Sequence, residues 1–311
     1  MKIVRYATFF IMIFLAIGGY AFFLEHEKVV EAEPPLMKNL TPKRVVSMHP
    51  GITQLLLELQ LENTVVATVR PYQKIAGELG TRYEKLPLLQ EIYTPSRETV
   101  MELQPDLIIG WEHQFSEMEI GPETFWNKRG IRTYIVPTTL QNAHPSVRGE
   151  FFALLDDIGQ MFDCQEKTDV YKAQIEHRIN ALPTVKERKK IIILQAYGDG
   201  KYTLYGNSYL IDDIVRLAGG DNLVEKTISF VSAEQVLAYD PDFILFVSYP
   251  GADGGPMKDE QAKEKLQQDK EIKSLPALKA GNIINVPFAQ VNGADLSSMD
   301  LMEKIGEKLN N

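Results

Sequence analysis

The chain has 311 residues, of which 44% are apolar and 24% charged, and it contains one cysteine. This is the composition of an ordinary globular protein, and a single cysteine excludes both an intramolecular disulfide and a multi-cysteine metal site. The formal net charge of −9 argues against nucleic acid as a partner, because binding to phosphates needs a basic face.

An apolar segment near the amino terminus indicates where the protein works. Lys2 and Arg5 precede an uncharged run of 18 residues over 7–24, a length between a long signal-peptide core and a short membrane span. The basic flank before it and the acidic flank after it orient the body away from the cytoplasm. We expect residues 1–24 to be a membrane anchor at the extracytoplasmic face of the cell membrane. The alternative is a cleaved signal and a secreted or periplasmic protein.

Residues 25–41, rich in Glu and Pro, are predicted to be a tether, and an α/β body follows from residue 42. The strands predicted in chain order are 43–48, 65–69, 107–111, 133–136, 190–196, 243–247 and 282–286, with helical stretches between them. Strands that alternate with helices predict parallel sheets. Gly198-Asp199-Gly200 predicts a hairpin turn.

An internal repeat indicates two equivalent halves. SRETVMELQPDLIIG at 96–110 and SAEQVLAYDPDFILF at 232–246 align without gaps, with six of fifteen positions identical. Each copy predicts a short helix, a Pro-Asp stop and a buried strand, because proline cannot continue a helix. A chance recurrence of a common α/β connection is the alternative, but the matching position of both copies favours two lobes, 42–145 and 183–311.

The segment 146–182 is predicted to join the lobes. Its apolar residues recur at helical spacing from Val147 to Phe162 and again from Tyr171 to Ile179. We expect one long linking α-helix, which at 1.5 Å per residue would span about 50 Å. Two helices with a bend at Asp163-Cys164 are the alternative.

These features resemble the substrate-binding proteins of iron–siderophore, haem and cobalamin ABC importers. The resemblance rests on PKRVVSMHPGITQLLLELQ at 42–60, the two repeats, AGGDN at 218–222 and LPALKAGNIINVP at 275–287. It implies an α/β fold of two Rossmann-like lobes with parallel sheets and a ligand cleft between them. It further implies capture of a metal chelate, with a ferric siderophore expected first and cobalamin or haem as alternatives.

The same resemblance implies an ABC permease and its ATPase as partners, and we expect a monomer without an intrinsic cofactor. No pair of histidines has the spacing of a metal site, so we expect any metal to arrive inside its chelator. The sequence lacks GxSxG, GxxxxGK(S/T) and zincin motifs, so we expect no enzymatic activity. The alternative from another class is an extracytoplasmic enzyme or a membrane-anchored sensor on the same scaffold, since fold does not fix function.

The cleft is expected at the carboxyl ends of the strands, where open α/β sheets bind ligands. The turns there hold His49, Arg70, Tyr72, Trp111 and His113 in the first lobe and Tyr197, Tyr205, Phe230, Tyr249 and Asn292 in the second. Aromatic rings offer rigid contact area, and arginine pairs with carboxylate or hydroxamate oxygens. This set predicts a site for a bulky, partly aromatic, partly anionic chelate. His49 and His113 are candidate axial ligands to haem iron or cobalt, or else hydrogen-bonding residues that line the turn.

Glu98 and Glu234 are the glutamate that the two repeats share. The resemblance implies that they dock into basic pockets of the permease, one from each lobe. A glutamate near a helix start also complements the helix dipole, so capping alone would explain each of them.

Overall fold

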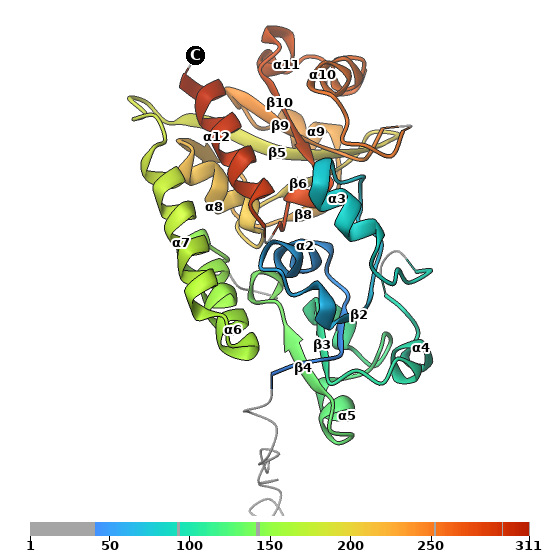
Figure 1. Cartoon of the computed structure of the whole chain (residues 1–311). Coiled ribbons are helices and arrows are strands. Elements are labelled where there is room, and N and C mark those ends of the chain that lie inside the picture. Colours follow the sequence, from blue (N-terminus) through green and yellow to red (C-terminus); the bar gives the residue numbers. More distant parts are fainter. Residues whose placement is uncertain (1–40, 92–93, 141–143, 252, 294, 311) are drawn as a thin grey trace, which may run out of the picture. The chain divides into compact units, whose positions relative to one another are not determined.

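The structure is a computed structural model that describes residues 41–91, 94–140, 144–251, 253–293 and 295–310 (Figure 1). The predicted anchor over 1–24 and all but the last residue of the predicted tether lie outside these ranges. Within them, no helix combines the length and the apolarity that crossing a bilayer requires. The described residues build two β-sheets, which correspond to the two predicted lobes.

The first sheet is parallel throughout and has the strand order β2-β1-β3-β4. Its elements are β1 (Val45–Ser47), α2 (Pro50–Glu58), β2 (Val65–Thr68), α3 (Gly77–Glu84), α4 (Arg97–Glu102), β3 (Leu107–Gly110), α5 (Glu123–Asn127) and β4 (Arg132–Ile135). The central strands β1 and β3 are buried along their whole length, as expected where helices cover both faces of a parallel sheet. All four strands predicted for this lobe are confirmed.

The second sheet is mixed, which differs from the parallel sheet expected there. Its elements are β5 (Lys189–Gly198), β6 (Lys201–Tyr205), α8 (Leu210–Leu217), β7 (Gly220–Asn222), β8 (Ile228–Ser232), α9 (Ala233–Leu237), β9 (Phe243–Ser248), α10 (Asp259–Gln267), α11 (Pro276–Ala280), β10 (Ile283–Pro287) and α12 (Ser297–Asn310). Strands β10, β9, β5 and β7 run parallel, whereas β6 pairs antiparallel with β5 on one side and with β8 on the other.

The cause of the mixed sheet is the predicted turn Gly198-Asp199-Gly200. All three residues have positive φ (89°, 51° and 65°), which reverses the chain and pairs β6 with β5 as a hairpin. The hairpin prediction is therefore confirmed, and the sheet is mixed because β6 runs antiparallel to its neighbours β5 and β8.

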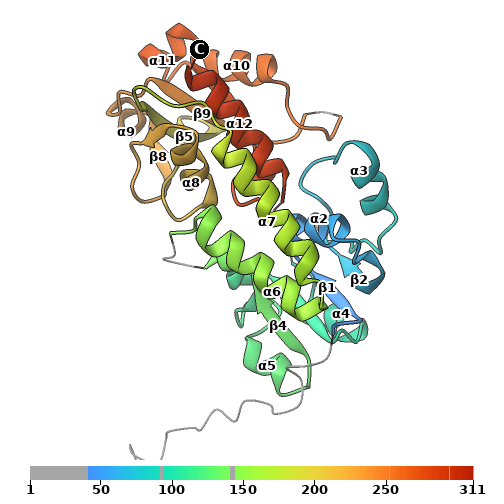
Figure 2. The same ribbon diagram turned by 60° about the vertical axis from the view of Figure 1, so that its left-hand side comes forward.

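The linking segment is a helical pair and not one long helix (Figure 2). A π-helical turn (Val147–Phe151) leads into α6 (Phe152–Phe162), and α7 (Gln165–Asn180) follows after a break. Asp163 ends α6 in the left-handed conformation, with φ 53° and ψ 48°. The helices then pack antiparallel, as the ion pairs Lys172–Asp156 and Arg148–Glu176 show, the latter at 2.8 Å. The expected span of about 50 Å is therefore wrong, because each helix covers at most half of it.

Helix α7 nevertheless contacts both lobes. Near its start, the Lys167 ammonium donates to the backbone oxygen of Leu59 at the end of α2 (2.8 Å). Near its end, Arg178 pairs with Glu303 on α12 at 2.7 Å. The joint between the lobes is therefore helical, but it consists of two antiparallel helices and not of one continuous helix.

One cluster of buried apolar side chains runs through both lobes and the helical pair. It includes Leu56 from α2, Leu155 from α6, Ile193 from β5 and Ile305 from α12. Two further clusters cover the other faces of the two sheets, one around Trp126 and one around Phe246, Leu204 and Val236. Each large apolar side chain buried in this way contributes roughly 1.5–3 kcal/mol.

We predict that Asp163→Ala lowers the free energy of unfolding by up to about 1 kcal/mol, because aspartate tolerates the left-handed backbone through local hydrogen bonds of its short polar side chain, which alanine lacks. Asp163→Gly is the matched control and should preserve or raise stability, since glycine has no Cβ and adopts positive φ freely. Urea unfolding measures both. An alanine variant as stable as the glycine variant would contradict the left-handed break between α6 and α7.

Candidate ligand-binding cavity

Residues of both lobes line a cavity of about 220 Å³. This volume lies somewhat below the roughly 300–1,000 Å³ typical of small-molecule sites. The first lobe contributes His49, Pro50, Gly51, Gln54, Tyr72, Trp111, His113 and Gln114, and the second contributes Tyr205, Tyr209, Phe288, Ala289, Val291 and Asn292. Most of these residues follow the carboxyl end of a strand, which is where the sequence predicts the cleft.

The first-lobe wall is built on the turn between β1 and α2. His49 is the N-cap of α2, and its Nδ1 accepts a hydrogen bond from the backbone N–H of Ile52 (3.3 Å). Beneath the turn, the Thr53 hydroxyl lies 2.8 Å from that of Ser47 and 2.7 Å from that of Thr68. These buried hydroxyl groups hold β1, β2 and the first turn of α2 together, so the position of His49 is fixed.

Trp111 completes this wall. Its indole stacks on the His49 ring at a centroid distance of 4.9 Å and an interplanar angle of 22°, and the His113 ring lies 5.9 Å from it. The Gln114 side chain accepts from the backbone N–H of Trp111 at 2.8 Å and thereby fixes the start of this segment.

Both histidines of the wall are disposed to be neutral. Burial lowers the pKa of His49 from 6.5 to about 3, and only a backbone hydrogen bond opposes this shift. Burial also lowers the pKa of His113, against the raising effect of Glu119 and Glu112. His49 is therefore uncharged at any physiological pH.

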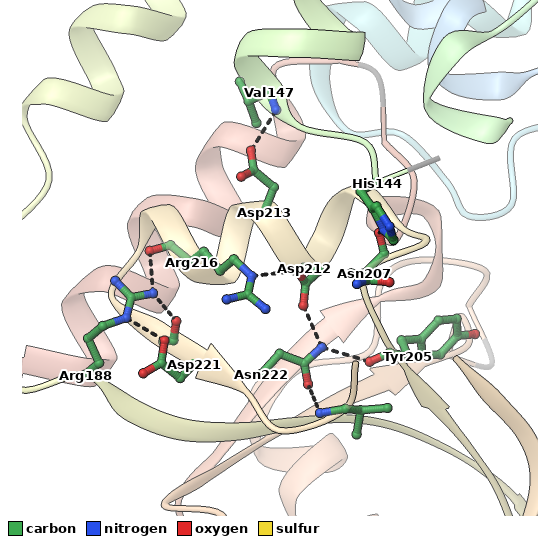
Figure 3. A network of polar contacts seen from close by, with 12 residues as sticks. His144, Val147, Arg188, Tyr205, Asn207, Asp212, Asp213, Arg216, Asp221 and Asn222 are labelled. Carbon is green, nitrogen blue, oxygen red and sulfur yellow. Dashed lines mark hydrogen bonds and ion pairs between the residues drawn. The ribbon is translucent and has the colours of Figure 1, made fainter. Parts of the chain in front are cut away.

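The second-lobe wall rests on a polar network around Asp212 (Figure 3). The amide of Asn222 donates to the Asp212 carboxylate (2.8 Å) and to the backbone oxygen of Tyr205 (3.0 Å), while Arg216 pairs with the other oxygen of Asp212 (2.8 Å). Strand β7 and helix α8 thus fix the end of β6. Tyr205 packs edge-on against Tyr209 at 5.0 Å, and both rings face the cavity.

The lining is aromatic and carries no permanent charge. Five of its residues are Tyr72, Trp111, Tyr205, Tyr209 and Phe288, and none of the described lining residues is Asp, Glu, Lys or Arg. In the described ranges, no group of three His, Cys, Asp or Glu side chains is placed to hold a metal ion. The cavity therefore suits a ligand that offers flat apolar surface and a few polar atoms.

The two lobes touch at the rim of the cavity. The backbone N–H of Lys74 donates to the oxygen of Gly254 across the lobes at 2.7 Å. The ring of Phe288 lies 5.5 Å from that of Tyr72 in the first lobe and 5.3 Å from that of Tyr249 in the second. One side of the cavity is therefore closed by direct contact between the lobes.

A second contact between the lobes lies behind the cavity, along α2. Gln54, which lines the cavity, donates to the carboxylate of the buried Asp295 in the second lobe (3.2 Å). The other oxygen of Asp295 accepts from the backbone N–H of Ser297 (2.8 Å). One turn after Gln54, Glu58 accepts a hydrogen bond from the Tyr171 hydroxyl on α7 (2.5 Å). Helix α2 therefore contacts the cavity, the second lobe and the helical pair.

The two carboxyl groups at this contact titrate abnormally. Burial raises the pKa of Glu58 from 4.5 to about 7, with smaller contributions from Asp295 and Asp300 and an opposing hydrogen bond from Tyr171. Burial also raises the pKa of Asp295. Glu58 is therefore protonated in part near neutral pH.

The cavity brings together six of the ten residues that the sequence predicts for the ligand site. These are His49, Tyr72, Trp111, His113, Tyr205 and Asn292. Four others, Arg70, Tyr197, Phe230 and Tyr249, are exposed and do not belong to the described lining. The expected pairing of an arginine with an anionic ligand therefore finds no support at Arg70. Tyr197 and Phe230 instead stack on each other at 5.4 Å.

Two aromatic lining residues, Tyr209 and Phe288, were not predicted. Phe288 directly follows β10, so the rule that ligands bind at the carboxyl ends of strands could have predicted it. Tyr209 lies in the turn between β6 and α8, and the same rule missed it because no strand was predicted at 201–205.

A comparison with known protein families places this chain in one of them. The sequence profile of the periplasmic binding proteins matches residues 45–289, which includes both sheets and the helical pair. The chain belongs to the periplasmic binding protein family.

Individual relatives of this periplasmic binding protein are distant. The high-affinity heme uptake system protein IsdE of Staphylococcus aureus is 24% identical over 258 residues, which cover 81% of this chain and 82% of IsdE. A periplasmic binding protein from Veillonella parvula superposes with a TM-score of 0.75 at 24% identity, covering 86% of this chain and 91% of that one. An ABC-type Fe³⁺-hydroxamate transport protein from Saccharomonospora viridis gives 0.72 at 20% identity, covering 87% and 94%. The predicted family and α/β fold class are confirmed.

Glu58→Gln should remove part of the pH dependence of stability. The unfolded carboxyl titrates near 4.5 and the folded one near 7, so the native state binds more protons in this window. The contribution of Glu58 to the free energy of unfolding is therefore fully present below pH 4.5 and is lost as the pH rises through about 7. Urea midpoints at a series of pH values from about 5 to about 8 should fall less in the variant than in the wild type. Glu98→Gln, at an exposed position, is the control and should retain the wild-type slope; equal slopes in all three proteins would contradict the prediction.

Proposed function

We propose that this protein is the extracytoplasmic substrate-binding protein of an ABC importer, and that it captures a metal chelate in the cavity between its lobes and delivers it to the permease. The observation that carries the proposal is a cavity lined by aromatic rings from both lobes. The names of the relatives, which concern heme uptake and Fe³⁺-hydroxamate transport, support the same role. The membrane anchor over residues 1–24 stays a prediction from the sequence.

The lining narrows the class of chelate. Burial of an unpaired charge loses more hydration free energy than contacts with a neutral cavity can offset. The described lining holds no Lys or Arg that could pair with an anionic ligand. The site therefore favours a chelate whose buried part carries no net charge, such as the haem macrocycle, a ferric hydroxamate or a cobalamin. It disfavours a ferric catecholate, which carries several negative charges.

Delivery requires a surface that the permease recognises on both lobes. Glu98 and Glu234 lie in the first turns of α4 and α9, both are exposed, and both helices begin at a serine N-cap, Ser96 and Ser232. The two carboxylates therefore occupy matching positions on the two lobes. We infer that they bind basic groups of the permease, whose ATPase drives transport.

The ligand can be found with a panel of haem, a ferric hydroxamate, cyanocobalamin and a ferric catecholate. At least one of the first three should raise the melting temperature, because a ligand that binds only the native state stabilises it. Trp111→Ala should weaken binding about 30-fold or more, as expected for a central aromatic contact. Phe230→Ala, an exposed aromatic outside the lining, is the control and should keep the wild-type affinity, measured by calorimetry. A panel without any binding would contradict the proposed function.

Docking can be separated from binding by a double substitution. Glu98→Ala with Glu234→Ala should abolish uptake by cells that carry only this variant, while the affinity for the ligand stays unchanged. The matched control is Glu102→Ala with Asp240→Ala, which removes exposed carboxylates near the other ends of the same helices. Normal uptake by the first variant would show that the two glutamates act only as helix caps.

A further inference from the structure

Two ring nitrogens in the first-lobe wall have no hydrogen-bond partner. They are Nε2 of His49 and Nε1 of Trp111, both buried. His49 is only 3% exposed, and both residues line the cavity with their rings stacked. Buried polar groups in folded proteins are nearly always paired, so two unpaired nitrogens on adjacent rings of a cavity wall require an explanation.

The helix cap determines which nitrogen of His49 carries the proton. The backbone N–H of Ile52 donates to Nδ1, so Nδ1 must offer a lone pair. The imidazole is neutral, and a neutral imidazole has one N–H and one acceptor nitrogen. The proton of His49 therefore sits on Nε2, which is a donor. The indole Nε1 of Trp111 can only donate.

We propose that His49 and Trp111 form a two-donor subsite that binds oxygen acceptors of the chelate, such as carboxylate, hydroxamate or amide oxygens, and that His49 does not coordinate the metal. This inference rests on the proposed function and specifies the polar chemistry of the same cavity. Both donors come from one wall, so the acceptor-bearing edge of the ligand faces the start of α2.

Metal coordination by His49 conflicts with the fold. A lone pair on Nε2 would require the proton to move to Nδ1, where it would oppose the Ile52 N–H and break the cap of α2. Coordination through Nδ1 would break the same hydrogen bond. The His113 ring does not cap a helix, so metal coordination by His113 would break no such hydrogen bond. If a histidine of this wall coordinates the metal, it is His113.

The tautomer can be measured without any ligand. We expect ¹⁵N-detected NMR of histidine-labelled protein to show His49 as the neutral Nε2–H form, unchanged from about pH 5 to about pH 8. His49→Asn assigns the signal and should retain the fold, because asparagine is also a good N-cap. A neutral ring with its proton on Nδ1 would overturn the assignment of Nε2 as the donor, and titration near pH 6.5 would contradict the neutral state that burial imposes on His49.

The subsite can be tested with iron(III) protoporphyrin IX and its metal-free form, and with ferric and gallium hydroxamates. For whichever of these two pairs the protein binds, His49→Asn should lower the affinity for both compounds of the pair by the same factor, about 10-fold for one lost hydrogen bond. The visible spectrum of the bound iron complex should stay unchanged. Trp111→Phe keeps the aromatic stack, removes the other donor, and should cause a similar loss. His177→Asn, exposed on α7, should have no effect.

A loss confined to the iron form, or a changed spectrum in His49→Asn, would show that His49 is a metal ligand and would overturn the proposal. Unchanged affinity in both His49→Asn and Trp111→Phe would overturn the donor subsite. If the wild-type protein binds none of these probes, the proposed capture of haem or a ferric hydroxamate is contradicted. The NMR measurement still decides the tautomer of His49 in that case.

Discussion

The placement of α2 is the constraint on which the other features depend. The helix has nine residues, and its apolar side chains are buried along nearly its whole length. Its cap forms part of the cavity wall, Gln54 binds Asp295 of the second lobe, and Glu58 binds Tyr171 of the helical pair. At about 1.5 Å per residue these three contacts lie within some 14 Å of one another. A change in how the lobes meet must therefore move α2 or break one of its contacts.

Much of the fold could be predicted from the sequence because its strands are short runs of β-branched and aliphatic residues that end at recognisable turns. The strands at 65–69 and 243–247 are examples, since both are buried and bounded by helices. The sequence offered the break between α6 and α7 at Asp163-Cys164 only as the alternative to one long helix. Helical periodicity continues on both sides of Asp163, and periodicity does not reveal the positive φ of a single residue. The mixed sheet, by contrast, could have been predicted, because the hairpin turn at 198–200 already requires an antiparallel strand after β5.

The site could be predicted only in outline. The rule that ligands lie at the carboxyl ends of strands correctly located the turns of His49 and Trp111 at the cavity, since backbone topology alone fixes their position. The rule does not fix where a side chain points, which is why Arg70 is exposed although the turn that carries it lies close to the site. The tautomer of His49 also needed coordinates, because it follows from one hydrogen bond to Ile52.

The neutral lining has a consequence for selectivity in different media. Dissolved salt weakens attraction between exposed charges over distances of about 8–10 Å, but it has little to screen where the contacts are stacking and hydrogen bonding. Capture in this cavity should therefore respond weakly to the ionic strength around the cell, and discrimination between cargo molecules should depend on their outline and on where their oxygen atoms lie.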